Sequence, residues 1–340
     1  MFKKLLNSIV DTIKEEYKFI IFLLLITIIF NIPMNYYITV GGGISDISKR
    51  IEVEDGKKSK GSFNLSYVTQ LDGTLLSYGL SYVIPSWERE SADEYKIELE
   101  EDIDDIEFRG KLDLEVANSN AIYWAYTLAN ETVEVKNSKI YVISKSGEEF
   151  PSSLEIQDEL ISIDNQHYDS ITDYVEYIQT KSAGDEIEVK VIRNKKEKIV
   201  KTKIYEKDDT KLIGIYLQKL TTYKTNPKVN IKFKRKESGP SAGMISTLEI
   251  YNQLTENDLT KGLKIAGTGT IEPDGKIGEI GGIEHKVKGA VHAKSDIFLS
   301  PGGKNYTDAK KYIDDNNLKI KLVKVDDIED AIHKLNNIKK

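Results

Sequence analysis

The segment KFKRKESGPSAGMISTLEIY, residues 232–251, joins an alternating charged run to an apolar run. Pro240 suits the first turn of a helix, where the amide hydrogen that proline lacks would have no partner. Met244 and Leu248 then recur at helical spacing. The segment therefore predicts a strand, a tight turn rich in Gly, Pro and Ser, and a helix that begins next to Ser241.

The chain on both sides of this junction, residues 211–338, alternates between strand and helix patterns, which is typical of an α/β domain. The expected strands are KVNIKF, GLKIAGTGTI, DIFLS and LKIKLVKV, and the expected helices after the junction are GGIEHKVKGAVHAK, NYTDAKKYIDDN and DDIEDAIHKL.

The composition is that of a globular protein with two or three domains. Of 340 residues, 39% are hydrophobic and 30% charged, and the net charge of −7 argues against a nucleic-acid partner. Cysteine is absent, which excludes disulfides, thiolate metal ligands and cysteine nucleophiles. The four histidines form no metal-binding motif, and no Walker A motif occurs. We therefore expect no metal and no cofactor.

The N-terminal segment predicts a membrane anchor. No charged residue lies between Lys18 and Asp46, and residues 19–40 are mostly apolar, about the length that spans a bilayer. Four lysines precede this run, which places residues 1–18 in the cytoplasm and the rest outside the cell. The alternative is a cleaved signal peptide, but no small-x-small cleavage site follows.

An acidic run precedes an expected helix. Between residues 98 and 107, seven of ten residues are Asp or Glu, without the glycine and spacing of a calcium-binding loop. We interpret this run as a solvated acidic loop. Residues 111–130 then show helical spacing of apolar side chains.

Residues 137–205 resemble a PDZ domain. A strand at 139–144, a Leu154–Asp158 pattern, a tight turn, a helix and a closing hairpin follow in the family's order. Gln157 stands where the family usually has glycine, and its glycine-containing carboxylate-binding loop has no clear counterpart near residues 139–142. The resemblance implies peptide binding by strand addition, with a purely structural β-rich domain as the alternative.

Ser241 has the setting of a nucleophile. At a helix N-terminus, unpaired amide groups and the helix dipole would stabilise an oxyanion forming beside it. Histidine is scarce, so the base we expect is a lysine whose pKa is lowered by burial. Lys286, at an expected helix start between Ile283 and Val287, has apolar neighbours that could supply this burial.

The motifs GPSAGM and GTGTIEPDGKIGEIGGIEHK together resemble the proteolytic domain of the Lon family. The resemblance implies Ser241 as nucleophile, Lys286 as general base and Thr268 as the residue that helps to position the lysine. Gly239, Pro240 and Ala242 are the matching residues around the serine. Archetypal members have Asp before Gly-Pro-Ser, whereas this chain has Ser238.

The wider layout resembles Lon-like proteases of Gram-positive bacteria that have a membrane anchor and a PDZ domain but no ATPase module. We therefore expect a transmembrane helix at 19–40 after the cytoplasmic segment 1–18. A first part of an α/β (α+β) protease domain follows at 45–132, an inserted PDZ domain at 133–206, and the catalytic part at 207–340. Lon-type domains often form rings, and the sequence does not decide whether this chain forms a homo-oligomer.

The predicted function is that of a membrane-anchored, ATP-independent serine endopeptidase that cleaves extracytoplasmic peptides or membrane-protein segments selected by the PDZ domain. One alternative is a peptide-binding scaffold with an inactive protease fold. Another is an esterase, because Gly239–Gly243 fits a Gly-x-Ser-x-Gly elbow. That reading would recruit Asp258 or Asp274 with His285 or His292.

Overall fold

The computed structural model describes residues 2–97 and 101–338, with side chains from residue 13 onward. The chain divides into two compact units, one of Met1–Gly41 with Thr69–Tyr95 and one of Gly42–Val68 with Lys96–Lys340. The helices are α1 (Phe2–Phe30), α2 (Leu75–Leu80), α3 (Ile103–Ala129), α4 (Ile171–Gln179), α5 (Gly243–Leu254), α6 (Ile283–His292), α7 (Gly303–Asp315) and α8 (Ile328–Asn337), with short 3-10 turns η1 (Ile47–Lys49), η2 (Ala92–Tyr95) and η3 (Gly147–Glu149).

The strands are β1 (Pro33–Asp46), β2 (Ile51–Val53), β3 (Ser62–Thr74), β4 (Glu88–Ser91), β5 (Thr132–Lys145), β6 (Glu159–Ile163), β7 (Glu186–Arg193), β8 (Lys196–Lys203), β9 (Tyr205–Lys207), β10 (Thr210–Leu212), β11 (Ile215–Asn226), β12 (Val229–Ile231), β13 (Lys264–Gly267), β14 (Ile297–Pro301) and β15 (Lys321–Val325).

In the first unit, the N-terminal helix has a different extent from the predicted span 19–40. Helix α1 ends at Phe30 and strand β1 begins at Pro33, so the second part of the predicted span 19–40 is not helical. The side chain of Asn31 hydrogen-bonds to the Thr27 carbonyl, and Pro33 lacks the amide hydrogen that a continuing helix needs. None of the helices in residues 2–97 and 101–338 has the length and apolar character to cross a membrane.

The second unit contains a parallel sheet with helices on both faces. Strands β3, β13, β14 and β15 lie side by side in this order, all parallel. Successive side chains of a strand point to opposite faces. Ile265 and Leu299 accordingly join the core formed with α3, α5 and α8, while Ala266 and Phe298 join the core formed with α6 and α7. The α/β character of the C-terminal part thus follows the predicted alternation of strands and helices.

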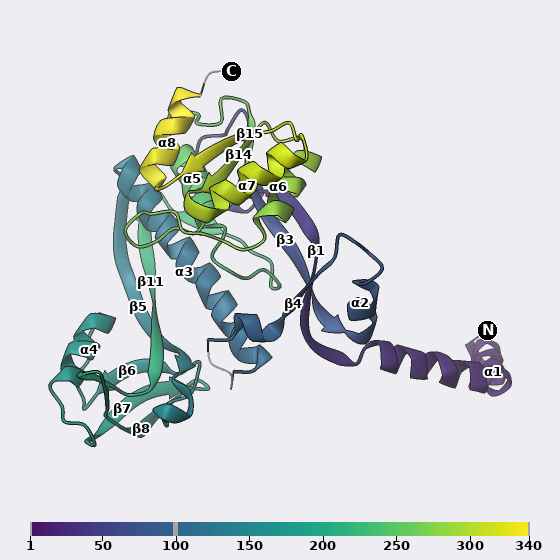
Figure 1. The fold of residues 1–340 in the computed structure, drawn as a ribbon, viewed down its shortest axis with the longest axis horizontal. Helices are drawn as coiled ribbons and strands as arrows, with labels where there is room; N and C mark the ends of the chain where they lie inside the picture. The colour runs from purple at the N-terminus through teal and green to yellow at the C-terminus, as the bar shows by residue number, and fades with distance from the viewer. Residues whose placement is uncertain (1, 98–100, 339–340) are drawn as a thin grey trace. The chain divides into compact units, whose positions relative to one another are not determined.

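A second sheet of the same unit has the strand order β11-β5-β6-β7-β8 and its own core. Helix α4 contributes the buried side chains of Tyr174 and Ile178 to this core. Strands β5 and β11 extend beyond it as a long antiparallel ribbon, paired from Ile215 with Lys145 to Asn226 with Thr132. Helix α3 packs along this ribbon (Figure 1).

Helix α3 begins earlier than the sequence predicts, at Ile103 instead of residue 111. The side chains of Asp102 and Asp105 form a capping box at its N-terminus, where carboxylates also favour the helix dipole. The acidic run is therefore helical from Ile103 onward and not a loop, although Asp102, Asp104 and Glu107 are exposed as predicted, and residues 98–100 lie outside the described part of the chain. Glu101, moreover, is buried.

Candidate active site

Ser241 lies two residues before the first residue of α5, next to its N-cap Ala242, and is partly exposed. Gly239 adopts a φ of 86°, a left-handed conformation that favours glycine, and its amide donates to the Gly110 carbonyl at 2.7 Å. The Pro240 carbonyl accepts the amide of Gly243 at 3.1 Å. The local sequence thus forms a tight turn that delivers Ser241 to the start of a helix.

Two backbone hydrogen bonds hold this turn against the segment that follows β13. The Gly269 amide donates to the Ser241 carbonyl at 3.0 Å, and the Met244 amide donates to the Gly269 carbonyl at 3.1 Å. Gly243 packs so closely that a Cβ atom there would lie 2.7 Å from the backbone nitrogen of Ile271. The second glycine of Gly-Pro-Ser-Ala-Gly is therefore required by the close approach of two backbones.

Lys286 lies in the first turn of α6 and is only 4% exposed. It shares its helix with Ile283 and Val287, which belong to the core on that face of the sheet. Burial lowers the pKa of Lys286 from its ordinary value of 10.5 to about 8. A substantial neutral fraction near neutral pH, which general-base chemistry requires, follows from this position.

Thr268 links the lysine to the serine. Lys286 Nζ donates to Thr268 Oγ1 at 3.2 Å, and Thr268 Oγ1 donates to the Ser241 carbonyl at 3.3 Å. Thr268 directly follows β13, while α5 and α6 approach from opposite faces of the sheet. The three residues therefore meet outside the carboxyl end of a parallel strand, where α/β sheets commonly place their ligands.

The family model of the Lon protease (S16) C-terminal proteolytic domain matches residues 228–337. The chain contains a Lon-type proteolytic domain. It is a serine endopeptidase of the Lon-like kind, a family characterised by a Ser-Lys dyad. A second model, that of the PDZ domain, matches residues 128–204.

Solved PDZ structures align with part of the chain. The PDZ domain of an SdrC-like protein from Listeria monocytogenes is 24% identical and covers 25% of this chain and 92% of its own, with a TM-score of 0.22. The corresponding domain from Listeria innocua is 29% identical and covers 23% and 92%, with a TM-score of 0.22. These scores carry no argument, and the PDZ assignment rests on the family model. No curated protein matches the chain.

The remaining predicted site residues of the Lon-type domain lie around the serine. Ala242 is buried at the N-cap of α5, and Ser238, which replaces the family's Asp, packs beside Gly110. Sequence reasoning missed Gly110 and Gly269 as residues that hold the turn. The GTGT motif signals Gly269, whereas no pattern in the sequence marks Gly110.

The carboxylates proposed for an esterase-type triad are engaged elsewhere. Asp258 accepts hydrogen bonds from the Thr260 side chain and the Lys60 amide, and Asp274 pairs with the side chain of Lys276. An elbow hydrolase requires its acid to orient a histidine. Asp258 and Asp274 instead form hydrogen bonds with residues of the loops around them.

The PDZ sheet has its free edges at β11 and β8. The strand at 139–144 lies inside β5, which pairs with β11 on one side and β6 on the other, so it has no edge to offer. Strands β11 and β8 are the two edges of this sheet, and Gly214, with a φ of 69°, precedes β11.

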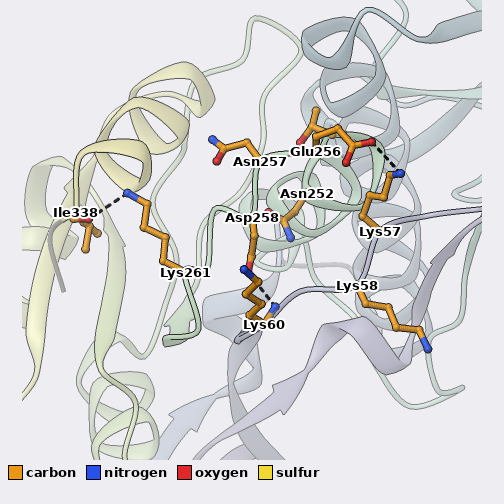
Figure 2. A pocket seen from close by; sticks show the side chains of 10 residues that line it. Lys57, Lys58, Lys60, Asn252, Glu256, Asn257, Asp258, Lys261 and Ile338 are labelled. Carbon is orange, nitrogen blue, oxygen red and sulfur yellow. Dashed lines mark hydrogen bonds and ion pairs between the residues drawn. The ribbon is translucent and has the colours of Figure 1, made fainter.

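A hollow of about 690 Å³ lies apart from these catalytic candidates, since neither Ser241 nor Lys286 lines it. Figure 2 shows several lysines around it, with Lys261 reaching the end of α8 and Lys57 facing Glu256. Lys261 Nζ donates to the carbonyls of Asn336 and Ile338. This contact neutralises unpaired carbonyl groups at a helix C-terminus, which is a structural role.

Proposed function

We propose that the chain hydrolyses peptide bonds with Ser241 as nucleophile and Lys286 as general base, without ATP. The observation that carries this assignment is the hydrogen-bonded link from Lys286 through Thr268 to Ser241. Neutral Lys286 takes the proton from Ser241 Oγ as the oxygen attacks the carbonyl carbon. The lysine then protonates the departing amine, and water attacks the acyl-enzyme by the same route to release the acid and restore both residues.

Thr268 supports this role by orienting the amine. Its hydroxyl hydrogen is directed at the Ser241 carbonyl, so its oxygen accepts one N–H of Lys286. A neutral lysine then keeps a lone pair available for the serine proton, which an ammonium group lacks. Burial supplies the neutral form, and Thr268 holds the amine beside the serine segment.

The oxyanion would be stabilised by backbone amides of the turn. Three amides of the turn already donate hydrogen bonds to carbonyl groups: Gly239 to Gly110, Gly243 to Pro240 and Met244 to Gly269. Within residues 101–338, by contrast, the amides of Ser241 and Ala242 donate no hydrogen bond. We assign these two amides at the start of α5 as the oxyanion donors.

The PDZ domain would select peptide or protein substrates by adding them as a strand to β11, between this edge and α4. The side chain of Gln179 in α4 makes two hydrogen bonds to the backbone of Lys211. The Lys211 amide donates to Gln179 Oε1 at 2.9 Å, and Gln179 Nε2 donates to the Lys211 carbonyl at 2.7 Å. This clamp fixes the segment that leads into the edge strand. Extended segments and protein tails are therefore the substrate class we propose.

We also propose that the N-terminal segment attaches the protein to the cell membrane with the protease outside. Apolar side chains of residues 19–30 are exposed, for example Phe22 at 56% and Ile28 at 64%. Lysines precede this stretch, as expected for a cytoplasmic N-terminus. The chain contains no cysteine, so single cysteines at Lys14 and Lys294 can report topology by labelling intact cells with an impermeant maleimide. Labelling of both positions, or of position 14 alone, would contradict this orientation.

Hydrolysis of a fluorogenic peptide by the purified full chain tests the catalytic assignment. We expect activity in the parent and in Lys276→Met, an exposed lysine of the same domain, and none in Ser241→Ala or Lys286→Met. Equal rates in all four proteins would reject the assignment. Peptide binding without cleavage by the parent would favour the scaffold alternative.

A further inference from the structure

Glu101 and Arg109 form a buried ion pair at the start of α3. The two guanidinium nitrogens of Arg109 donate to the two carboxylate oxygens of Glu101 at 3.0 and 2.8 Å. The residues are 4% and 9% exposed. Burial alone would raise the pKa of Glu101, but hydrogen bonds from Arg109, Ser144 and the Ile97 amide hold it below its ordinary value. The carboxylate is therefore charged and fully engaged.

The same pair binds the PDZ strand β5. The Ser144 hydroxyl donates to Glu101 Oε1, and Arg109 Nη1 donates to the Ile143 carbonyl at 3.1 Å. Both contacts lie at the end of β5 that belongs to the PDZ sheet, opposite Tyr216 and Leu217 of the edge strand β11. The start of α3 is thus fixed to the strand next to the proposed peptide groove.

The residue after Arg109 contacts the serine turn. The Gly110 carbonyl accepts the Gly239 amide at 2.7 Å, two residues before Ser241. A Cβ atom at position 110 would lie 3.3 Å from the Cβ of Ser238, so the helix and the turn are in close packing. This hydrogen bond therefore joins α3 directly to the turn at Gly239, the residue with the left-handed conformation.

A buried ion pair is a weak source of stability, since a well-packed apolar pair often does as well. Its directional hydrogen bonds, however, fix orientation. Two consecutive residues of α3 face the PDZ strand and the serine turn. Because the helix is rigid, a shift of Arg109 relative to β5 also shifts the Gly110 carbonyl relative to Gly239.

We propose that the Glu101–Arg109 pair is a positioning element that couples the PDZ domain to the catalytic turn. It orients the first turns of α3 against β5 so that the Gly110 carbonyl holds Gly239, and thereby Ser241, in attacking geometry. This inference rests on the proposed role of Ser241 as the nucleophile. Arg109 acts through Gly110 and does not touch the substrate.

The test compares Arg109→Gln with Arg193→Gln in the full chain. Arg193 is a matched control, because it also pairs with a buried carboxylate, Asp158 at 2.6 Å, but lies wholly within the PDZ sheet. For a short peptide that does not need the PDZ domain, Arg109→Gln should lower kcat at least tenfold with KM within twofold, since small misplacements of a nucleophile are costly. Arg193→Gln should leave both constants within twofold.

Hydrogen exchange provides a readout that does not depend on catalysis. Arg109→Gln should speed amide exchange in residues 237–243 as well as in β5, whereas Arg193→Gln should affect only the PDZ segments. Ser144→Ala and Gly110→Ala, milder changes on either side of the pair, should speed exchange at 237–243 while retaining the folding transition. These two variants decide the question if Arg109→Gln fails to fold.

Unchanged exchange at 237–243 in Ser144→Ala and Gly110→Ala, or a normal kcat in a folded Arg109→Gln protein, would overturn the coupling. Failure of a fluorophosphonate probe to label Ser241 in the parent would reject the proposed nucleophile instead. The exchange data would still report whether the turn depends on the ion pair.

Discussion

The activity should rise with pH through the titration of Lys286. Its pKa of about 8 lies 2.5 below the ordinary value of 10.5, which corresponds to about 3.5 kcal/mol at 1.4 kcal/mol per pH unit. At pH 7 about one molecule in ten carries the neutral amine, against roughly one in three thousand for an unperturbed lysine. Between pH 6 and 9 the neutral fraction, and with it kcat/KM, should increase roughly 90-fold and level off above pH 8.

The assay is kcat/KM for a fluorogenic peptide without titrating groups, measured across this range. The second-order rate of Ser241 labelling by a fluorophosphonate probe is measured in parallel, and Lys276→Met serves as control. A profile that is flat from pH 6 to 8.5 would refute the reasoning, as would one that still rises tenfold per unit at pH 9.5. The first would mean a base other than a buried lysine, and the second a lysine that is not desolvated.

Burying this lysine should cost stability. Because the unfolded chain binds the proton more tightly, stability should rise as pH increases from 8 to 10.5, and the full penalty applies below pH 8. Lys286→Met, which removes the buried amine, should raise the free energy of unfolding at pH 7 by up to about 3 kcal/mol while abolishing activity. Denaturant unfolding of both proteins measures this, and an equal or lower stability of the variant would contradict it.

Other residues of the Lon-type domain give further tests. Thr268→Val keeps the shape but removes both hydrogen bonds at 3.2 and 3.3 Å, and should lower kcat by about tenfold or more with little change in KM in steady-state assays. Burial raises the pKa of Glu249 from 4.5 to about 7, so stability should fall as pH rises between these values. Glu249→Gln should remove this fall and stabilise the protein at pH 8 by up to about 3 kcal/mol, seen in denaturant titrations at several pH values. Gly243→Ala, which drives a methyl group against the Ile271 backbone, should cost about 1–3 kcal/mol by thermal unfolding and lower the labelling rate of Ser241.

Much of the Lon-type domain could be read from local patterns. Helical spacing after Pro240 and the apolar strand before Thr268 are short-range signals, and the observed α5 and β13 follow them. The start of α3 was missed because an acidic run looks solvated, although carboxylates at a helix N-terminus are stabilised by its dipole. The predicted span 19–40 extends beyond the end of α1 because an apolar run has the same hydropathy in a helix and in a strand, and β1 begins at Pro33.

Sequence by itself determined the residue types and spacing of the Ser-Lys motif, the α/β alternation and the presence of a PDZ-like segment, since each depends on neighbours close in the chain. Only the tertiary structure decided that Lys286 is buried and bonded to Thr268, since desolvation comes from side chains on distant elements. It also decided that β11 is an edge strand of the PDZ sheet, because strand order depends on pairing across some eighty residues, as between Ile140 and Lys219. The contact of Gly110 with Gly239 has no local signature at all, because it joins two backbones more than a hundred residues apart.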